Sequence, residues 1–363
     1  MKKILMLPLL QFPSGHHQTA DAISAYIREI DPSVNIKKVD IFSYTSPLAE
    51  QLTSFFYLTA IKKAPSLYSR IYRNNACNIE DQRLSFYEIM FLKSIKKLIK
   101  QENPDMIICT HCLPSSLVSL LKKEEQLSVP VINVYTDYFI NSIWGLDQID
   151  LHLAPSRSLK QFLEFQGIST ENIAVTGIPV HPLITPRVGG NARQSPPYHV
   201  LVSGGNLGVG AIEKINFTSF SGKIKYFVLC GKNQQLYKRI EQMDLPFLQP
   251  ISYISSREEM NNLYDQMDIM LSKPGGVTIS ECLRKGIPLC LLETLPGPEE
   301  QNEQFLMEEN LAIKIDLDEL ENSLLDFLEN SMERQKVQKS LSDHLIDQEN
   351  IETVLTDFIQ KTL

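Results

Sequence analysis

The chain has 363 residues, 43% of them hydrophobic and 21% charged, which suits a soluble globular protein of two domains. Its net charge of −8 argues against a general nucleic-acid binder, so we expect no nucleic-acid partner. The charge is uneven, because residues 1–188 carry a net +2 and residues 189–363 a net −10.

The first residues imitate a signal peptide, but Pro8 interrupts their short apolar run and residues 11–14 offer no cleavage site. We therefore expect a first strand there. No apolar run approaches the ~18 residues of a membrane span, so any membrane contact should be peripheral. Cys109 and Cys112 form a lone Cys-x-x-Cys pair. Because Cys109 ends an apolar strand, a buried thiol in a reducing cytoplasm is favoured over zinc.

Strand and helix patterns alternate through the first half of the chain. Strands are predicted at 3–9, 34–40, 105–110, 131–135, 150–154 and 172–175, and helices at 17–30, 46–73, 84–101, 114–122 and 156–165. This alternation predicts an α/β domain with a parallel sheet. Residues 185–197, rich in proline and glycine, read as a linker.

The same pattern restarts after the linker. Strands are predicted at 198–203, 225–230, 249–254, 267–271 and 288–292, with a helix at 232–242 and helical segments from residue 316 onwards. We therefore predict two Rossmann-like domains facing a cleft, at 1–187 and 188–345. A final helix at 346–363 could pack back on the N-terminal domain.

Ser14-Gly15-His16-His17 follows the first predicted strand and begins the first helix. A helix N-terminus disfavours a protonated imidazole, so a histidine there should stay neutral near pH 7. A neutral histidine facing a cleft is a competent general base, and His16 is favoured over His17. The alternative is an ordinary polar cap with a solvated histidine pair.

Two glycine-lined turns follow strands of the second domain, at Ser203-Gly204-Gly205-Asn206-Leu207-Gly208 and at Ser272-Lys273-Pro274-Gly275-Gly276. Paired glycines expose backbone N–H groups at a helix N-terminus, which suits a phosphate. Ligands of open parallel sheets bind beyond the carboxyl ends of the strands. The two turns could hold a diphosphate, whereas each alone could be a plain tight turn.

Acidic and amide side chains follow these turns. Glu281 could accept hydrogen bonds from ribose hydroxyls, or it could simply be a favourable charge near the start of a helix. Glu299 and Asn302 could hold sugar hydroxyls, or they could cap a helix. Together with the glycine turns, these residues outline a nucleotide-sugar site.

The segment 46–100 mixes aromatic and basic side chains. It contains Phe55, Phe56, Tyr57, Tyr68 and Tyr72 beside Lys62, Lys63, Arg70 and Arg73, followed by Lys93, Lys96, Lys97 and Lys100. This composition suits the surface of a bilayer that carries anionic lipid. A core-facing helix with a solvated basic side is the alternative.

No metal is expected. Asp316-Leu317-Asp318 matches the Asp-x-Asp that holds manganese in one class of glycosyltransferase, but here it precedes a late helix, where capping is favoured. His111 and His152 are not spaced with other ligand types and define no metal site.

Six motifs, in this order, resemble the processive diacylglycerol glucosyltransferases and monogalactosyldiacylglycerol synthases. More distantly, they are similar to the lipid-linked N-acetylglucosaminyltransferase of peptidoglycan synthesis. The motifs span nearly the whole chain, at Gly-His-His-Gln-Thr-Ala (15–20), Val-Tyr-Thr-Asp-Tyr…Ile-Trp (134–144), Thr-Gly-Ile-Pro-Val-His-Pro (176–182), Cys-Gly-Lys-Asn (230–233), Ser-Lys-Pro-Gly-Gly (272–276) and Pro-Gly-Pro-Glu…Asn (296–302).

The resemblance implies a GT-B fold and metal-independent, inverting transfer of a hexose, with UDP-glucose favoured, from a UDP-sugar to a membrane lipid such as diacylglycerol. It implies a peripheral enzyme on the cytoplasmic face of the membrane. By position, His16 would be the general base, with Gly15, His17 and Asp137 on the acceptor side. The donor would contact Gly204, Gly205, Asn206, Gly208, Ile254, Ser272, Lys273, Gly275, Gly276, Glu281, Glu299 and Asn302.

The chain also departs from the family pattern. Pro13 replaces a glycine of the first loop, Asn141 stands where a histidine is common, His181 replaces a usual arginine, and Gln301 interrupts the acidic motif. These changes leave room for another lipid-like, polyprenyl-linked or small hydrophobic acceptor. They also permit a UDP-sugar-binding regulator that has lost catalysis.

Overall fold

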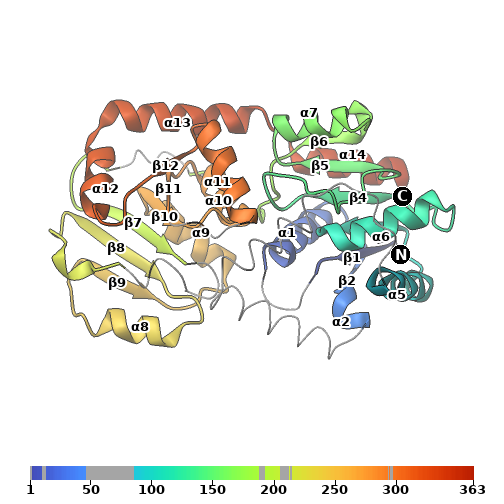
Figure 1. The fold of residues 1–363 in the computed structure, drawn as a ribbon, viewed down its shortest axis with the longest axis horizontal. Helices are drawn as coiled ribbons and strands as arrows, with labels where there is room; N and C mark the ends of the chain where they lie inside the picture. The colour runs from blue at the N-terminus through green and yellow to red at the C-terminus, as the bar shows by residue number, and fades with distance from the viewer. Residues whose placement is uncertain are drawn as a thin grey trace. The chain divides into compact units, whose positions relative to one another are not determined.

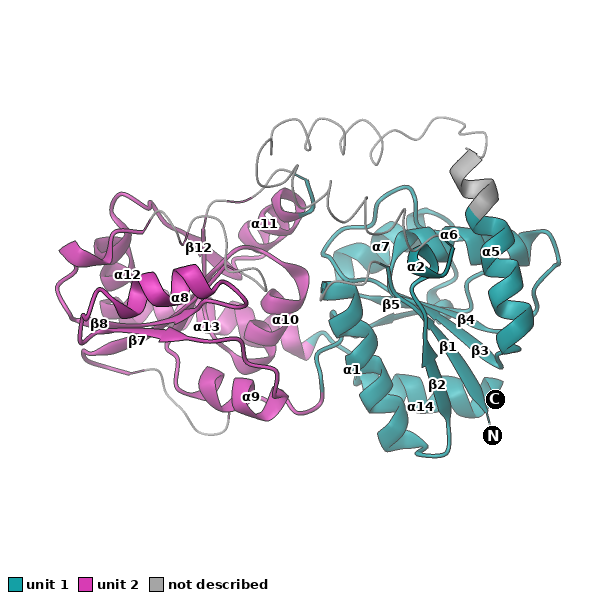
Figure 2. Ribbon diagram, turned by 90° about the horizontal axis from the view of Figure 1, so that it is seen from below, with its two compact units in different colours: residues 1–181, 296–298, 347–363 teal, residues 182–295, 299–346 magenta. Residues whose placement is uncertain are grey.

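The computed structural model describes residues 2–9, 14–45, 86–187, 193–204, 212, 215–292, 294 and 297–363. The predicted helix at 46–73, with its aromatic and basic residues, lies outside the described residues, as do Gly205, Asn206 and Gly208. The chain divides into two compact units (Figure 2). Unit 1 comprises Met1–His181, Pro296–Pro298 and Asp347–Leu363, and unit 2 comprises Pro182–Leu295 and Glu299–Ile346.

Unit 1 is built on a parallel sheet with the strand order β2-β1-β3-β4-β5-β6. Its strands are β1 (Lys3–Leu7), β2 (Asn35–Lys38), β3 (Met106–Cys109), β4 (Val131–Val134), β5 (Leu151–Ala154) and β6 (Ile173–Val175). Its helices are α1 (Gly15–Ile30), α2 (Ile41–Thr45), α5 (Phe86–Glu102), α6 (Cys112–Lys123), α7 (Arg157–Phe165) and α14 (Ile351–Thr362), with a 3-10 turn at Thr170–Asn172 (Figure 1). The predicted parallel α/β fold of this half is confirmed.

Helices cover both faces of the unit 1 sheet, because successive strand residues point to opposite sides. On one face, Ile4 and Met6 of β1 pack with residues of α1 and of the C-terminal helix α14. On the other face, Leu5 and Leu7 pack with α5 and α6. Strands that are buried on both faces read as continuous apolar runs, which is the pattern of β1 and β3, whereas the edge strand β2 is polar and largely exposed.

Unit 2 is built on a second parallel sheet, with the strand order β12-β11-β10-β7-β8-β9. Its strands are β7 (Tyr198–Ser203), β8 (Ile224–Leu229), β9 (Leu248–Ile251), β10 (Ile269–Ser272), β11 (Leu289–Leu291) and β12 (Ala312–Lys314). Its helices are α8 (Gln234–Glu241), α9 (Arg257–Asp265), α10 (Gly276–Lys285), α11 (Pro298–Glu308), α12 (Leu320–Glu329) and α13 (Ser331–Ile346), with a 3-10 turn at Phe217–Ser219 (Figure 1).

Each sheet has one switch point, at which successive strands begin to be added on the opposite side of the first strand. In unit 1 the chain adds β2 on one side of β1 and then β3 on the other side. In unit 2 it adds β8 and β9 on one side of β7 and then β10 on the other. Helices on either side of such a switch point diverge and leave a crevice at the carboxyl ends of the strands, where ligands bind.

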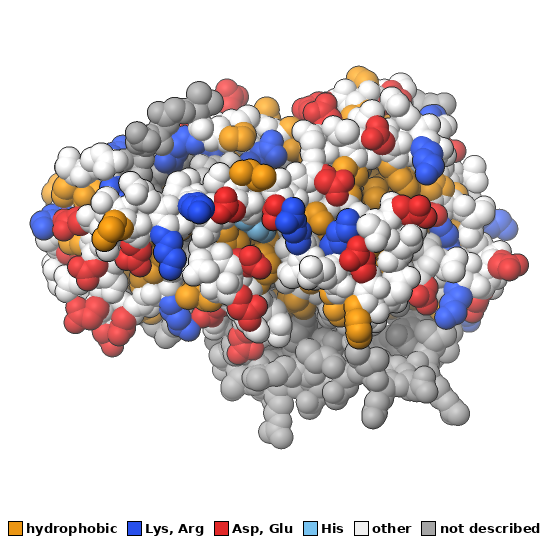
Figure 3. All heavy atoms as spheres, turned by 90° about the horizontal axis from the view of Figure 1, so that it is seen from above, with side chains coloured by type: hydrophobic (Ala, Val, Ile, Leu, Met, Phe, Trp, Pro, Cys, Tyr) orange, Lys and Arg blue, Asp and Glu red, His pale blue; other side chains and the backbone are white. Residues whose placement is uncertain are grey.

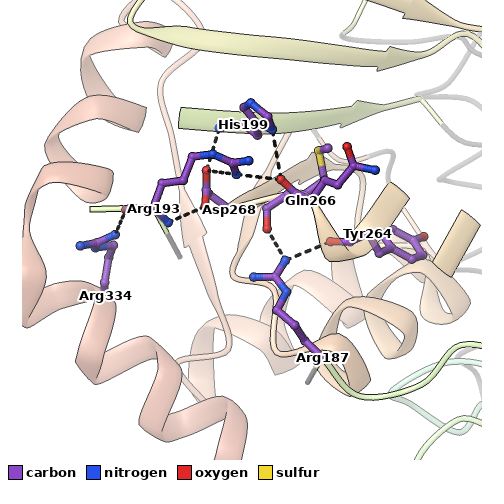
Figure 4. Close-up of polar contacts among 8 residues, drawn as sticks. Arg187, Arg193, His199, Tyr264, Gln266, Asp268 and Arg334 are labelled. Carbon is purple, nitrogen blue, oxygen red and sulfur yellow. Dashed lines mark hydrogen bonds and ion pairs between the residues drawn. The ribbon is translucent and has the colours of Figure 1, made fainter. Parts of the chain in front are cut away.

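A buried carboxylate, Asp268, fixes the entry into β7 and β10. Its Oδ1 accepts a hydrogen bond from Arg193 N at 2.8 Å, and its Oδ2 accepts one from His199 N at 2.8 Å (Figure 4). Arg193 also forms an ion pair with Asp268, with 3.1 Å between Nη1 and Oδ2. Nearby, the Arg187 guanidinium donates to the carbonyl of Tyr264 at 2.9 Å. Residues that precede β7 are thereby held to the start of β10.

None of the described helices is both long and apolar enough to cross a bilayer. On the face of the molecule that Figure 3 presents, acidic and basic side chains are interspersed.

Candidate functional site

His16 lies at the switch point of the unit 1 sheet. It is the second residue of α1, which follows β1, and Gly15 begins that helix while His17 continues it. The imidazole Nδ1 lies 2.9 Å from the carbonyl oxygen of Thr110, which directly follows the neighbouring strand β3. The hydroxyl of Thr110 returns a hydrogen bond to the carbonyl of His16 at 3.0 Å.

These contacts fix the tautomer of His16. A carbonyl oxygen can only accept, so Nδ1 carries the proton and Nε2 of the neutral ring is left unprotonated. The Thr136 hydroxyl also lies 3.0 Å from Nδ1 and itself donates to Asp137 Oδ2 at 3.3 Å. No described residue forms a hydrogen bond with Nε2 of His16. The imidazole is therefore oriented as a base whose unprotonated nitrogen, Nε2, is not hydrogen-bonded by any residue in the described part of the chain.

The surroundings also favour the neutral form of His16. Burial lowers its pKa below the usual value, and His17 lowers it further. Asp137 and the bond to the Thr110 carbonyl oppose that shift, because both favour the charged imidazolium. The balance is a ring that is neutral at pH 7, while the carboxylate of Asp137 is close enough to stabilise the imidazolium after proton transfer.

The residues of this site come from three neighbouring strands. His16 follows β1, Thr110 follows β3, and Thr136 and Asp137 follow β4. The predicted general base His16 and the predicted acceptor-side residue Asp137 are therefore brought to one edge of one sheet. Thr110 and Thr136 were not predicted as site residues. Each closely follows an apolar strand, and Thr136 also lies within the motif at 134–144.

His111 is a further residue that the sequence analysis set aside. It immediately precedes α6, and its ring meets that of His16 edge to face, with centroids 4.6 Å apart and an interplanar angle of 78°. The sequence signal for His111 is its position just after the predicted strand at 105–110. That position indicates a contact with His16 only once β3 is known to lie beside β1.

In unit 2, the described start of the first predicted glycine turn, Ser203-Gly204, and the second predicted turn, from Ser272 to Gly276, lie at the switch point of their own sheet. Ser203, followed by Gly204, ends β7 and lies in register with Ser272 at the end of β10. Gly275 is the N-cap of α10, which begins at Gly276, so their position at a helix N-terminus is confirmed. A Cβ added at Gly275 would meet no described atom within 4 Å, so the backbone there is open to an approaching group.

Three predicted donor-site residues lie around this helix N-terminus. Lys273 Nζ is 3.7 Å from the carboxylate of Glu299 on α11. Asn302 is buried and donates from Nδ2 to the carbonyl of Pro274 at 2.9 Å. That bond ties α11 to the loop between β10 and α10. Asn302 therefore shapes the site through the backbone, and whether it also contacts a hexose stays a prediction.

Glu281 is buried on α10 and contacts two protein groups. Its Oε2 accepts a hydrogen bond from the Tyr264 hydroxyl at 2.8 Å, and its Oε1 lies 3.5 Å from Arg257 Nη1. Burial raises the pKa of Glu281, although Tyr264 and Arg257 both lower it. The ribose contact predicted for Glu281 stays a prediction, and Tyr264 and Arg257 are partners that the sequence did not reveal.

Ile254 lines a separate hollow of about 580 Å³ between β9 and α9, with Tyr237 and Ser256 among its other lining residues. Its predicted contact with the base of a nucleotide stays a prediction. Among the residues that the structure describes, no group of three or more His, Cys, Asp or Glu side chains is placed to hold a metal ion.

Both halves of the chain match models of known protein families. Residues 16–180 match the family model of monogalactosyldiacylglycerol (MGDG) synthase, and residues 199–354 match that of the glycosyltransferase family 28 C-terminal domain. The chain is 38% identical to the uncharacterized glycosyltransferase YkoN of Bacillus subtilis (strain 168), over 99% of this chain and 98% of that protein. It is 25% identical to the processive diacylglycerol beta-glucosyltransferase of Bacillus pumilus (strain SAFR-032), over 99% and 95%.

Solved structures show the same fold at low sequence identity. MurG of Acinetobacter baumannii has a TM-score of 0.62 at 16% identity, covering 99% of this chain and all of that one. The glycotransferase of kitacinnamycin has a TM-score of 0.63 at 13% identity, covering 100% and 99%. The predicted GT-B architecture is confirmed. The chain belongs to the processive diacylglycerol glucosyltransferase and monogalactosyldiacylglycerol synthase family of UDP-sugar glycosyltransferases.

Proposed function

We propose that this glycosyltransferase moves a hexose from a UDP-sugar to the hydroxyl of diacylglycerol or a closely similar membrane lipid, with inversion and without a metal. UDP-glucose is the favoured donor. The observation that carries the proposal is the fixed tautomer of His16, because its Nδ1 donates to Thr110 and leaves Nε2 free to take a proton. The lipid acceptor is supported by the relative from Bacillus pumilus, which is named as a processive diacylglycerol beta-glucosyltransferase.

In the proposed reaction, Nε2 of His16 removes the proton of the acceptor hydroxyl. The acceptor oxygen forms a bond to the anomeric carbon while the bond from that carbon to the UDP oxygen breaks, and UDP leaves with the electron pair. Direct displacement of this kind inverts the anomeric carbon. The imidazolium that forms is stabilised by Asp137 through the Thr136 hydroxyl, which donates to the carboxylate at 3.3 Å.

The departing diphosphate needs positive charge or N–H donors. The N-terminus of α10, which begins at Gly276, supplies the backbone N–H groups of its first turn and the positive end of a helix dipole. The N–H of Gly275 itself donates to the Lys273 carbonyl at 2.9 Å. The open space at Gly275 leaves room for a phosphate to approach this backbone. Such donors can stabilise the leaving UDP without a metal ion.

Replacing His16 tests the proposed base. His16→Ala should lower kcat by about 10²- to 10⁴-fold, the usual contribution of a general base, while UDP binds with unchanged affinity because its predicted contacts lie in unit 2. Turnover would be measured with UDP-hexoses and diacylglycerol vesicles, followed by mass spectrometry of the lipids, and UDP binding by calorimetry. His17→Ala is the matched control, and its kcat should fall by less than tenfold. Equal turnover of His16→Ala and wild type would remove His16 from the mechanism.

We also propose peripheral contact with the inner, anionic face of the cell membrane through α5. Its apolar face packs in the core of unit 1, whereas Lys93, Lys97 and Lys100 are exposed on its outer side, with Lys96 half-buried beside them. None of these lysines forms an ion pair with a described carboxylate. Residues i, i+4 and i+7 share one helix face, so these charges form a stripe that suits anionic headgroups.

The stripe is tested by charge reversal. Each lysine near an anionic surface contributes about 1 kcal/mol, so Lys93→Glu combined with Lys97→Glu should weaken binding to anionic vesicles by at least about 30-fold. The control is Lys336→Glu combined with Lys339→Glu, two exposed lysines of α13 in unit 2. Vesicle co-sedimentation measures both. Equal losses in the two variants would mean that only net charge matters and would refute a specific contact through α5.

A further inference from the structure

A second histidine, His111, occupies one side of His16. The two rings contact each other in a T-shaped arrangement, with centroids 4.6 Å apart and planes 78° apart. The two residues follow the neighbouring strands β1 and β3 at the same sheet edge. Neither the family resemblance nor the catalytic scheme above uses His111, although no other described ring contacts His16.

The cap of α6 fixes the protonation state of His111. Its Nδ1 accepts a hydrogen bond from the backbone N–H of Leu113 at 3.1 Å, as an N-cap side chain does. A nitrogen that accepts this bond cannot carry a proton, so the neutral ring holds its proton on Nε2. Burial and the neighbouring His16 hold the pKa of His111 well below its usual range. Protonation of His111 would therefore break the cap and place a second positive charge beside His16.

We propose that His111 is a positioning residue for His16, shielding one side of its ring from water and holding Nε2 toward the acceptor while remaining unable to take the proton itself. The inference rests on the proposed function, in which His16 is the general base. The two rings have complementary roles, because His16 has a free basic nitrogen and His111 has its basic nitrogen occupied by the helix cap.

Other groups near His16 also raise or lower its pKa. Asp137, which follows β4, favours the imidazolium, and so does the Thr110 carbonyl. His17, on α1 itself, disfavours it. These groups stay in place when His111 is substituted. The substitution therefore changes only the access of water to the His16 ring and the charge of the side chain beside it.

The test uses two substitutions that both preserve an N-cap acceptor for α6, His111→Asn and His111→Asp. In His111→Asn, the smaller amide admits water, so the pKa of His16 should rise toward its usual value. In His111→Asp, an adjacent carboxylate should raise it further, by about one pH unit. The measurement is an NMR titration of the full protein labelled with ¹³C-histidine, in which His16→Ala assigns the His16 resonance.

Activity provides the second measurement. If His16 is the base, the acid limb of kcat/KM against pH should move to higher pH by the same amounts, in the order wild type, His111→Asn, His111→Asp. Thermal denaturation checks that both variants are folded. A His16 titration that is unchanged in both folded variants would overturn the positioning role alone. A His16 titration that shifts while the acid limb stays in place would overturn His16 as the base, and with it the inference that rests on that base.

Discussion

Removing the carboxylate of Asp268 should destabilise unit 2 severely. The side chain is only 2% exposed and accepts hydrogen bonds from the backbone N–H groups of Arg193 and His199, both at 2.8 Å. Asp268→Ala leaves both N–H groups without their acceptor. It also removes the carboxylate that pairs with the Arg193 guanidinium, whose Nη1 lies 3.1 Å from Oδ2 and also donates to the Gln266 carbonyl at 2.8 Å.

The expected magnitude follows from these contacts. Each buried donor that loses its partner costs about 1–3 kcal/mol, so two of them give about 2–6 kcal/mol. The Arg193 side chain is 37% exposed, so water can replace its partner and it adds little. We therefore expect Asp268→Ala to lower the free energy of unfolding of unit 2 by about 4 kcal/mol. With a urea m-value of about 2 kcal/mol per M for a unit of this size, the unfolding midpoint should fall by about 2 M.

The single tryptophan allows the two units to be followed separately. Trp144 is buried in unit 1, so its fluorescence reports the unfolding of that unit, whereas far-UV circular dichroism reports both units. In Asp268→Ala, the dichroism should show an early transition that precedes the change in Trp144 fluorescence. Asp268→Asn should lose less, because its amide oxygen still accepts one of the two backbone bonds.

Asp318→Ala is the matched control, because Asp318 is an exposed aspartate of the same unit. Its substitution should change the free energy of unfolding by less than about 0.5 kcal/mol. If Asp268→Ala unfolds at the same urea concentration as this control, the two backbone N–H groups find other acceptors and the argument from buried donors is refuted.

Two further predictions concern unit 1. Gly145→Ala should cost at least about 2 kcal/mol, because the new Cβ would lie 2.5 Å from the Ser115 carbonyl oxygen, and the urea midpoint of Trp144 fluorescence should report the loss. Burial lowers the pKa of His152 to about 4, so the unfolded chain takes up the proton at a higher pH than the folded chain. The free energy of unfolding should therefore decrease by about 3 kcal/mol as the pH falls from 6.5 toward 4. His152→Gln should flatten this pH dependence of urea unfolding, and an unaltered dependence would contradict it.

Much of the local structure could be predicted from the sequence. Apolar runs such as those of β3 and β10 predicted buried strands, and both strands are buried along their whole length. Cys109, at the end of such a run, is a free, buried thiol, as expected. The glycine pair 275–276 predicted a helix start, and α10 begins at Gly276. These predictions succeed because each depends on a few neighbouring residues, whose spacing sets the period of a strand or a helix.

Contacts between distant residues could not be predicted in this way. The sequence analysis placed His16 at a strand end but could not pair it with Thr110, 94 residues further along the chain. It set His111 aside as a metal ligand and could not foresee its contact with His16, which depends on the pairing of β1 with β3. It assigned Glu281 and Asn302 to ligands, without knowledge of the contacts that they make with Tyr264 and with the Pro274 carbonyl.

The sequence by itself therefore determined most of the strands and helices, although not β12 or α2, together with the fold class, the family and the residue types available at each strand end. Only the tertiary structure decided which strand ends are neighbours, and hence which side chains orient, shield or neutralise one another. The physical reason is that helix and strand periods are local properties of the chain, whereas strand order is set by the burial of both faces of each sheet. Residues far apart in the sequence meet only after that burial is complete.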